Sequence, residues 1–214
     1  AACGVVAVRR PSKILPMMPD QERSDPSASL RAAALLVTEG ALVELSAADA
    51  REVVSYMRPQ RVGAGQIVIR AGETRRNDFM ALVLHGEVTV ENAPAASHEG
   101  MVVSVLGPGS LIGEMGLVDG GPRSATCTAN SDLVLAVLTR EAVLHMMDAR
   151  PAVAARLMLA IAKRIADHLR DTNRKLMTLA RVSKALQQEL DAVHAVNKRL
   201  LDQVPATPVA KARG

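Results

Sequence analysis

The sequence predicts an α+β fold: an antiparallel β-roll of the jelly-roll kind, flanked by N-terminal helices and followed by one long C-terminal helix. Two observations support this prediction. Between residues 61 and 139, short β-prone runs alternate with glycine-containing turns. From residue 152 to residue 203, no glycine or proline interrupts a helical pattern.

The composition limits the classes of function. The 214 residues suffice for one domain with extensions, and 49% of them are hydrophobic. Tyr56 and Phe79 are the only aromatic residues, so neither base stacking by aromatic side chains nor an aromatic ligand cage is expected. The net charge of +4 is mild and does not by itself imply a nucleic acid or a membrane as partner.

The two cysteines, Cys3 and Cys127, form neither a disulfide framework nor a zinc-binding spacing. We expect Cys127 to be a small core residue, and we expect no metal and no cofactor. No apolar run is long enough to cross a membrane, and no signal segment begins the chain. These features predict a reducing, cytoplasmic setting.

The first part of the chain predicts an irregular arm over residues 1–28, because prolines recur in it. A helix is expected over residues 30–45. Ser46 is a good N-cap for the next helix, which should end near Met57.

Six β-prone runs follow. We expect strands at residues 66–69, 79–84, 88–90, 101–106, 124–129 and 133–138. His85-Gly86, with strands on both sides, predicts a tight hairpin. Residues 29–150 are therefore expected to form the β-roll with its flanking helices.

The remainder of the chain is helical in pattern. A short helix is expected over residues 141–148, and Pro151 suits the first turn of the long helix. We expect that helix, a lid or dimerisation element, to cover residues 151–204 and to be followed by a frayed tail over residues 205–214.

The long helix carries a heptad pattern. Apolar residues recur at the a and d positions of a coiled coil. These are Leu169, Leu176, Leu179, Leu186, Leu190, Val193 and Leu200. Asn197 at an a position is typical of a parallel two-stranded coil, which predicts a homodimer. The alternative is a single amphipathic helix packed on its own domain, and a larger bundle or another protein's helix could also use this surface.

Residues 113–129 combine the groups that bind a phosphate joined to a sugar. Gly113 and Glu114 open a short helix, whose N-terminal N–H groups attract an anion. Arg123, after a glycine-proline break, offers a planar fork for two phosphate oxygens. A carboxylate beside a phosphate is repulsive unless it has its own role, such as accepting a ribose hydroxyl.

This stretch resembles the phosphate-binding cassette of the cyclic-nucleotide-binding domain family. The family pattern is roughly Gly-Glu-x-(Ala/Gly)-Leu, a variable gap, and then Pro-Arg-(Ser/Ala/Thr)-Ala-Thr, and every fixed position is present in residues 113–117 and 122–126. The resemblance extends over about residues 40 to 175. It implies a β-roll that binds a cyclic nucleotide.

The resemblance also implies roles for single residues. Arg123 would bind the cyclic phosphate, Ser124 and the N–H of Ala125 would complete the phosphate shell, and Glu114 would accept the ribose 2′-hydroxyl. Further residues would line the pocket, namely Ile112, Gly113, Met115 and Gly116. Each of these residues could instead have a role without a ligand. Arg123 could form a salt bridge with Glu114 or Asp119, Glu114 could cap the helix, and the others could be plain packing or strand residues.

The choice of base is less defined. Ser124 favours cyclic AMP within this family, where threonine tends to accompany cyclic GMP. In the catabolite activator protein, a family member, a Thr-Ser pair on the long helix contacts adenine, and here that pair is His168-Leu169. His168 is the first candidate for a base contact, with a plain surface histidine as the alternative. Further candidates are Arg164, Thr172 and Arg174. Cyclic GMP stays open as the ligand, and the changed lid also leaves room for cyclic di-GMP.

The sequence therefore predicts a cyclic-nucleotide sensor that signals through its long helix to a dimer mate or another, unknown, protein partner. Only about ten residues follow the helix and no recognition helix is visible, so DNA binding is not expected. No catalytic set stands out, so no enzyme is predicted. The alternatives are a dimerising adaptor that binds no nucleotide and a regulatory fragment of a larger enzyme, channel or transporter.

Overall fold

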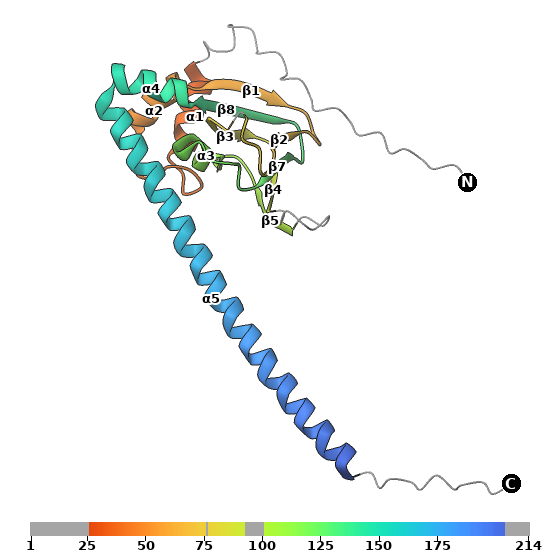
Figure 1. Cartoon of the computed structure of the whole chain (residues 1–214). Coiled ribbons are helices and arrows are strands. Elements are labelled where there is room, and N and C mark those ends of the chain that lie inside the picture. The colour runs from red at the N-terminus through yellow and green to blue at the C-terminus, as the bar shows by residue number, and fades with distance from the viewer. Residues whose placement is uncertain (1–25, 76, 93–100, 204–214) are drawn as a thin grey trace, which may run out of the picture. The chain divides into compact units, whose positions relative to one another are not determined.

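The computed structural model describes residues 26–75, 77–92 and 101–203 (Figure 1). The chain divides into two compact units, Ala1–Ile165 and Ala166–Gly214. Most of the predicted arm (residues 1–25) and the predicted tail lie outside the described residues.

The first unit contains two four-stranded antiparallel sheets, which confirms the predicted fold class. One sheet has the order β1-β8-β3-β6 and the other β2-β7-β4-β5. The strands are β1 (Arg58–Val62), β2 (Ile67–Ile69), β3 (Phe79–His85), β4 (Val88–Asn92), β5 (Met101–Leu106), β6 (Leu111–Ile112), β7 (Thr126–Ala129) and β8 (Leu133–Thr139). The sequence analysis missed β1, which has no apolar alternation, and β6, which is only two residues long.

The first sheet is buried on both faces. Along β3, Ala81 and Val83 face the core between the sheets, whereas Met80 and Leu82 face a second core that the helices cover. This explains the continuous apolar run of β3, because a strand with two buried faces needs no polar alternation. Figure 1 shows α1, α2 and α4 gathered on one side of the β-roll.

The predicted hairpin at His85-Gly86 is wrong. Strand β3 pairs with β6 and β8, whereas β4 pairs with β5 and β7, so the turn links the two sheets. Gly86 has φ +85, and a Cβ there would lie 2.4 Å from the Asp132 carbonyl oxygen. The glycine is thus required by its positive φ and by close packing.

The first predicted helix has different ends. Helix α1 is Pro26–Leu36, and turns replace the expected helix up to residue 45. Thr38 Oγ1 lies 2.8 Å from the Leu35 carbonyl oxygen, a local bond that competes with helix continuation. The turns still bury Leu42 and Leu45, and this is why the segment has an apolar pattern without being helical.

The second helix, α2 (Ala47–Ser55), begins as predicted. Ser46 is its N-cap, and its hydroxyl accepts a hydrogen bond from the Asp49 backbone N–H at 3.1 Å. Helix α3 is Glu114–Asp119 and α4 is Arg140–Ala149, with Thr139 as the N-cap of α4.

Helix α5 (Pro151–Gln203) begins at the predicted proline. Within the first unit, Ala154, Leu157 and Ile161 form a helical face that is buried in the core. In the second unit, every side chain from residue 167 to residue 199 is exposed. The exposed residues include the predicted heptad positions, such as Leu179 (64% exposed) and Leu186 (61% exposed).

Candidate functional site

The predicted cassette is a short helix between two left-handed glycines. Gly113 (φ +78) precedes α3 and Gly120 (φ +65) follows it, and the N–H of Gly120 donates to the Gly116 carbonyl oxygen at 3.0 Å. The helix begins directly after β6. The chain then returns through Pro122 and Arg123 to β7.

The backbone of Arg123 is fixed by the loop that follows β2. Its N–H donates to the Glu73 carbonyl oxygen at 3.1 Å, and its carbonyl oxygen accepts from the Gly72 N–H at 2.8 Å. These two bonds hold the backbone of Arg123 three residues before the start of β7. From there its side chain reaches the start of α3.

The Arg123 side chain is 5% exposed. Its Nη1 donates to the carbonyl oxygens of Gly113 (2.8 Å) and Phe79 (3.0 Å). The guanidinium carbon lies 4.4 Å from the centre of the Phe79 ring, a cation–π contact.

Burial lowers the pKa of Arg123, and the negative charges of Asp78, Glu73 and Glu114 oppose this shift. An arginine keeps its charge in proteins even so. The site thus holds a permanent, buried cation close to the N-terminus of a helix, an environment suited to an anion.

Two glycines allow this close approach. A Cβ at Gly113 would lie 2.7 Å from Arg123 Nη1, and a Cβ at Gly116 would lie 2.8 Å from the same atom. Real Cβ atoms do not approach so closely. Glycine at both positions therefore lets the guanidinium lie against the backbone of α3.

Glu114 is also buried, at 6% exposure, in the first turn of α3. Arg164 of α5 reaches it, with 3.9 Å between Arg164 Nε and Glu114 Oε1. Arg164 also donates from Nη1 to the Ala41 carbonyl oxygen at 3.2 Å. A carboxylate so placed can accept a hydroxyl hydrogen bond while the guanidinium balances its charge.

The other predicted residues of the cassette surround these two charges. Ser124 is exposed, and its Oγ lies 3.9 Å from Met115 Sδ. Met115 is 46% exposed, whereas Ile112 is buried in the core between the sheets, so its side chain acts in packing. Ala125 is half-buried.

His168 and Thr172 lie in the second unit and are exposed. The Thr172 hydroxyl donates to the His168 carbonyl oxygen at 2.9 Å, a bond within α5. Their contact with a base stays a prediction.

Sequence reasoning missed Asn77 and Arg140, which hold the C-terminal end of α3. Asn77 Nδ2 donates to the carbonyl oxygens of Gly120 and Gly121, and Arg140 bonds to the last carbonyls of the helix. Neither residue belongs to the cassette motif. Their partners are 22 to 44 residues away along the chain, so only the fold reveals them.

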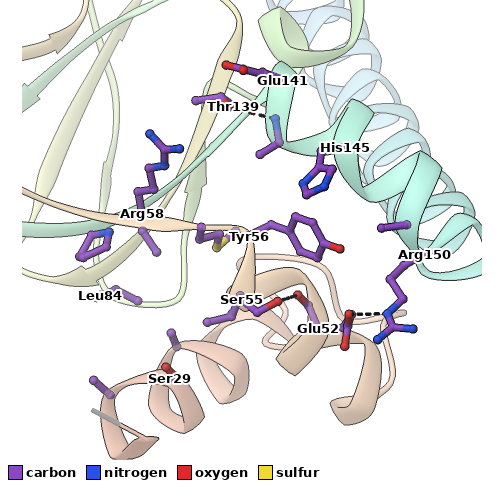
Figure 2. Close-up of a pocket in the computed structure, with 18 residues that line it drawn as sticks. Ser29, Glu52, Ser55, Tyr56, Arg58, Leu84, Thr139, Glu141, His145 and Arg150 are labelled. Carbon is purple, nitrogen blue, oxygen red and sulfur yellow. Dashed lines mark hydrogen bonds and ion pairs between the residues drawn. The ribbon is translucent and has the colours of Figure 1, made fainter. Parts of the chain in front are cut away.

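A separate pocket of about 670 Å³ lies among α1, α2, β1, β8 and α4. Figure 2 shows Tyr56 and His145 in it, and their rings meet edge to face at 5.7 Å. Glu52 accepts a hydrogen bond from Arg150 Nε at 2.9 Å at its rim. The residues that line this pocket include none of the predicted site residues, so the pocket is distinct from the cassette.

Comparison with known proteins agrees with this geometry. Residues 59–150 match the family model described as cyclic nucleotide-binding domain. These residues belong to the cyclic nucleotide-binding domain family. The match includes both the cassette and the sheets that carry it.

Two curated relatives are similar over this region. A cyclic nucleotide-gated potassium channel of Rhizobium etli is 38% identical over 92 residues, which is 43% of this chain and 23% of the channel. The cyclic AMP receptor protein of Thermus thermophilus is 32% identical over 112 residues, which is 52% of this chain and 50% of the receptor. The chain thus spans half or less of the length of these relatives.

A solved structure shows the same fold. The catabolite activator protein of Thermus thermophilus is 28% identical, with a TM-score of 0.56, over 68% of this chain and 63% of that one. The described residues contain no helix that is long and apolar enough to cross a membrane. They also contain no cluster of three or more histidine, cysteine, aspartate or glutamate side chains able to hold a metal ion.

Proposed function

We propose that this chain is a regulatory module that senses a cyclic mononucleotide, cyclic AMP first among them. The observation that carries the proposal is that two buried charged side chains, Arg123 and Glu114, both lie at the glycine-bounded start of α3. Buried charged side chains that gather in one place are typical of functional sites.

In the proposed complex, the cyclic phosphate binds at the N-terminus of α3 beside Arg123. The guanidinium and the N-terminal amides of α3 supply charge and hydrogen bonds, with Ser124 and the N–H of Ala125 beside them. Glu114 accepts the ribose 2′-hydroxyl. The similarity to a cyclic nucleotide-gated channel and to a cyclic AMP receptor supports this class of ligand.

The signal is proposed to leave through α5. Its exposed heptad side chains support pairing with the same helix of a second chain, because burying such a stripe removes apolar surface from water. Ligand binding would then shift a population between two arrangements of α5, with His168 and Thr172 meeting the base in one of them. A cytoplasmic location follows from this proposal.

Calorimetry tests the ligand. Cyclic AMP, cyclic GMP and cyclic di-GMP are titrated into the wild-type protein and into Arg123→Ala and Arg123→Lys variants. Micromolar or tighter binding of one nucleotide, about −8 kcal/mol, is expected for the wild type only. The lysine variant keeps the charge but lacks the fork that holds two phosphate oxygens.

Arg150→Ala is the control, since Arg150 is an exposed arginine paired with Glu52, away from the cassette. Absence of binding by folded wild-type protein to all three nucleotides would refute the sensor and favour the dimerising adaptor. Spin labels at Leu190 test the signal: an inter-helix distance that is the same with and without the nucleotide would refute transmission through α5.

A further inference from the structure

The C-terminal end of α3 is capped by a side chain from another element. Arg140, the first residue of α4, donates from Nε to the Leu117 carbonyl oxygen at 3.1 Å. Its Nη2 donates to the carbonyl oxygens of Leu117 at 2.9 Å and Val118 at 3.0 Å. The last carbonyls of a helix have no partners within the helix, and a cation there is favourable.

Helix α3 depends on such outside contacts because it has only six residues. A helix so short is unstable by itself in water. At its other end, Arg123 holds the carbonyl oxygen of Gly113. Two arginines from different parts of the chain thus fix the two ends of the helix that carries Glu114.

Arg140 is itself held firmly. Its backbone N–H donates to the Asp78 carbonyl oxygen at 2.7 Å, and the adjacent Asn77 bonds to the turn after α3. Thr139, the residue before it, is the N-cap of α4. Arg140 therefore begins α4 and also contacts both the loop before β3 and the end of α3.

We propose that Arg140 is a positioning residue for the nucleotide site. It acts through α3: it keeps the amides of the first turn and the Glu114 carboxylate where the ligand needs them. This inference rests on the proposed function. Because α3 carries both the N-terminal amides and Glu114, the loss of Arg140 weakens the phosphate contacts of every cyclic nucleotide. It weakens in addition the contact with a ribose 2′-hydroxyl.

The test compares Arg140→Met with Arg150→Met, which removes an arginine from the other end of α4 and leaves α3 untouched. Calorimetry uses cyclic AMP and 2′-deoxy cyclic AMP. Arg140→Met is expected to weaken cyclic AMP by tenfold or more, about 1.4 kcal/mol. It should weaken 2′-deoxy cyclic AMP by a smaller factor, because this analogue lacks the hydroxyl that Glu114 accepts. Arg140→Lys recovers part of the affinity, since an ammonium still donates to a carbonyl, and Arg150→Met stays within twofold of the wild type.

Amide hydrogen exchange without ligand tests whether Arg140 positions α3, independently of whether the protein binds a nucleotide. In Arg140→Met, residues 114–119 are expected to exchange at least fivefold faster while β3 and β8 keep their wild-type protection. Wild-type affinity in a folded Arg140→Met variant, or unchanged exchange in α3, overturns the proposal. If the wild type binds no cyclic nucleotide, the proposed function fails, and the exchange of α3 alone then decides whether Arg140 positions this helix.

Discussion

Replacing Gly116 by alanine sets two physical effects against each other. Inside a helix, alanine is more favourable than glycine by about 0.5–1 kcal/mol, so local propensity predicts a stabilised protein. The structure predicts the reverse. An added Cβ would lie 2.5 Å from the Asn77 carbonyl oxygen and 2.8 Å from Arg123 Nη1.

The contact with Asn77 decides the sign, because it involves the backbone and no side-chain rotation can relieve it. Overpacking of this kind costs about 1–3 kcal/mol. Set against the propensity gain, the net loss of unfolding free energy is about 1–2 kcal/mol. Nucleotide affinity should fall as well, because the displaced atoms are those that hold Arg123 against α3.

Urea unfolding followed by circular dichroism measures the effect. With a slope of about 1–3 kcal/mol per molar urea, the midpoint should fall by roughly 0.3–2 M while the slope is unchanged. Gly107→Ala is the matched control, since nothing lies within 4 Å of a Cβ there. It should be neutral or slightly stabilising. A Gly116→Ala variant as stable as the wild type would show that α3 does not pack as described.

Two other properties follow from the structure. Burial raises the pKa of Cys127 to about 12. The thiol should therefore resist iodoacetamide at pH 8 until the chain unfolds, as read by mass spectrometry of the peptide that contains it. Because the unfolded thiol ionises near pH 9 and the folded one does not, the stability contribution of Cys127 is fully present below pH 9 and declines up to about pH 12; a constant unfolding free energy over that range would contradict the assignment. Separately, Leu186→Glu places a charge in the proposed coil and should convert a dimer to a monomer in sedimentation, without changing the melting of the β-roll. Lys184→Glu, away from the a and d positions, is the control, and an unchanged mass for Leu186→Glu would argue against the coil.

The sequence predicted much of this fold because its signals are local. Ser46 caps a helix through a bond to a residue three positions away, and Pro151 begins α5. The strand runs near Phe79 and Leu133 are apolar along their whole length. The cassette is also local in sequence: Arg123 contacts Gly113, and Ser124 contacts Met115, at the start of α3.

The predictions that failed involve contacts between distant segments. His85-Gly86 has the composition of a hairpin, but strand pairing sends the two flanking strands to different sheets. The expected helix at residues 30–45 ends at Leu36, because Thr38 and Gly40 pack against Gly109 and the turns bury the same apolar residues.

The sequence by itself determined which residues form the cassette motif and most of the strands, because turn, capping and hydrophobic signals act over a few neighbours. Only the tertiary structure decided what supports them. Arg164 beside Glu114 and Arg140 at the end of α3 reach their partners across 50 and 23 positions of the chain. Because a guanidinium can donate to many different acceptors, an arginine in the sequence does not reveal which group it will contact. The packing of β3, α3, α4 and α5 fixes that choice.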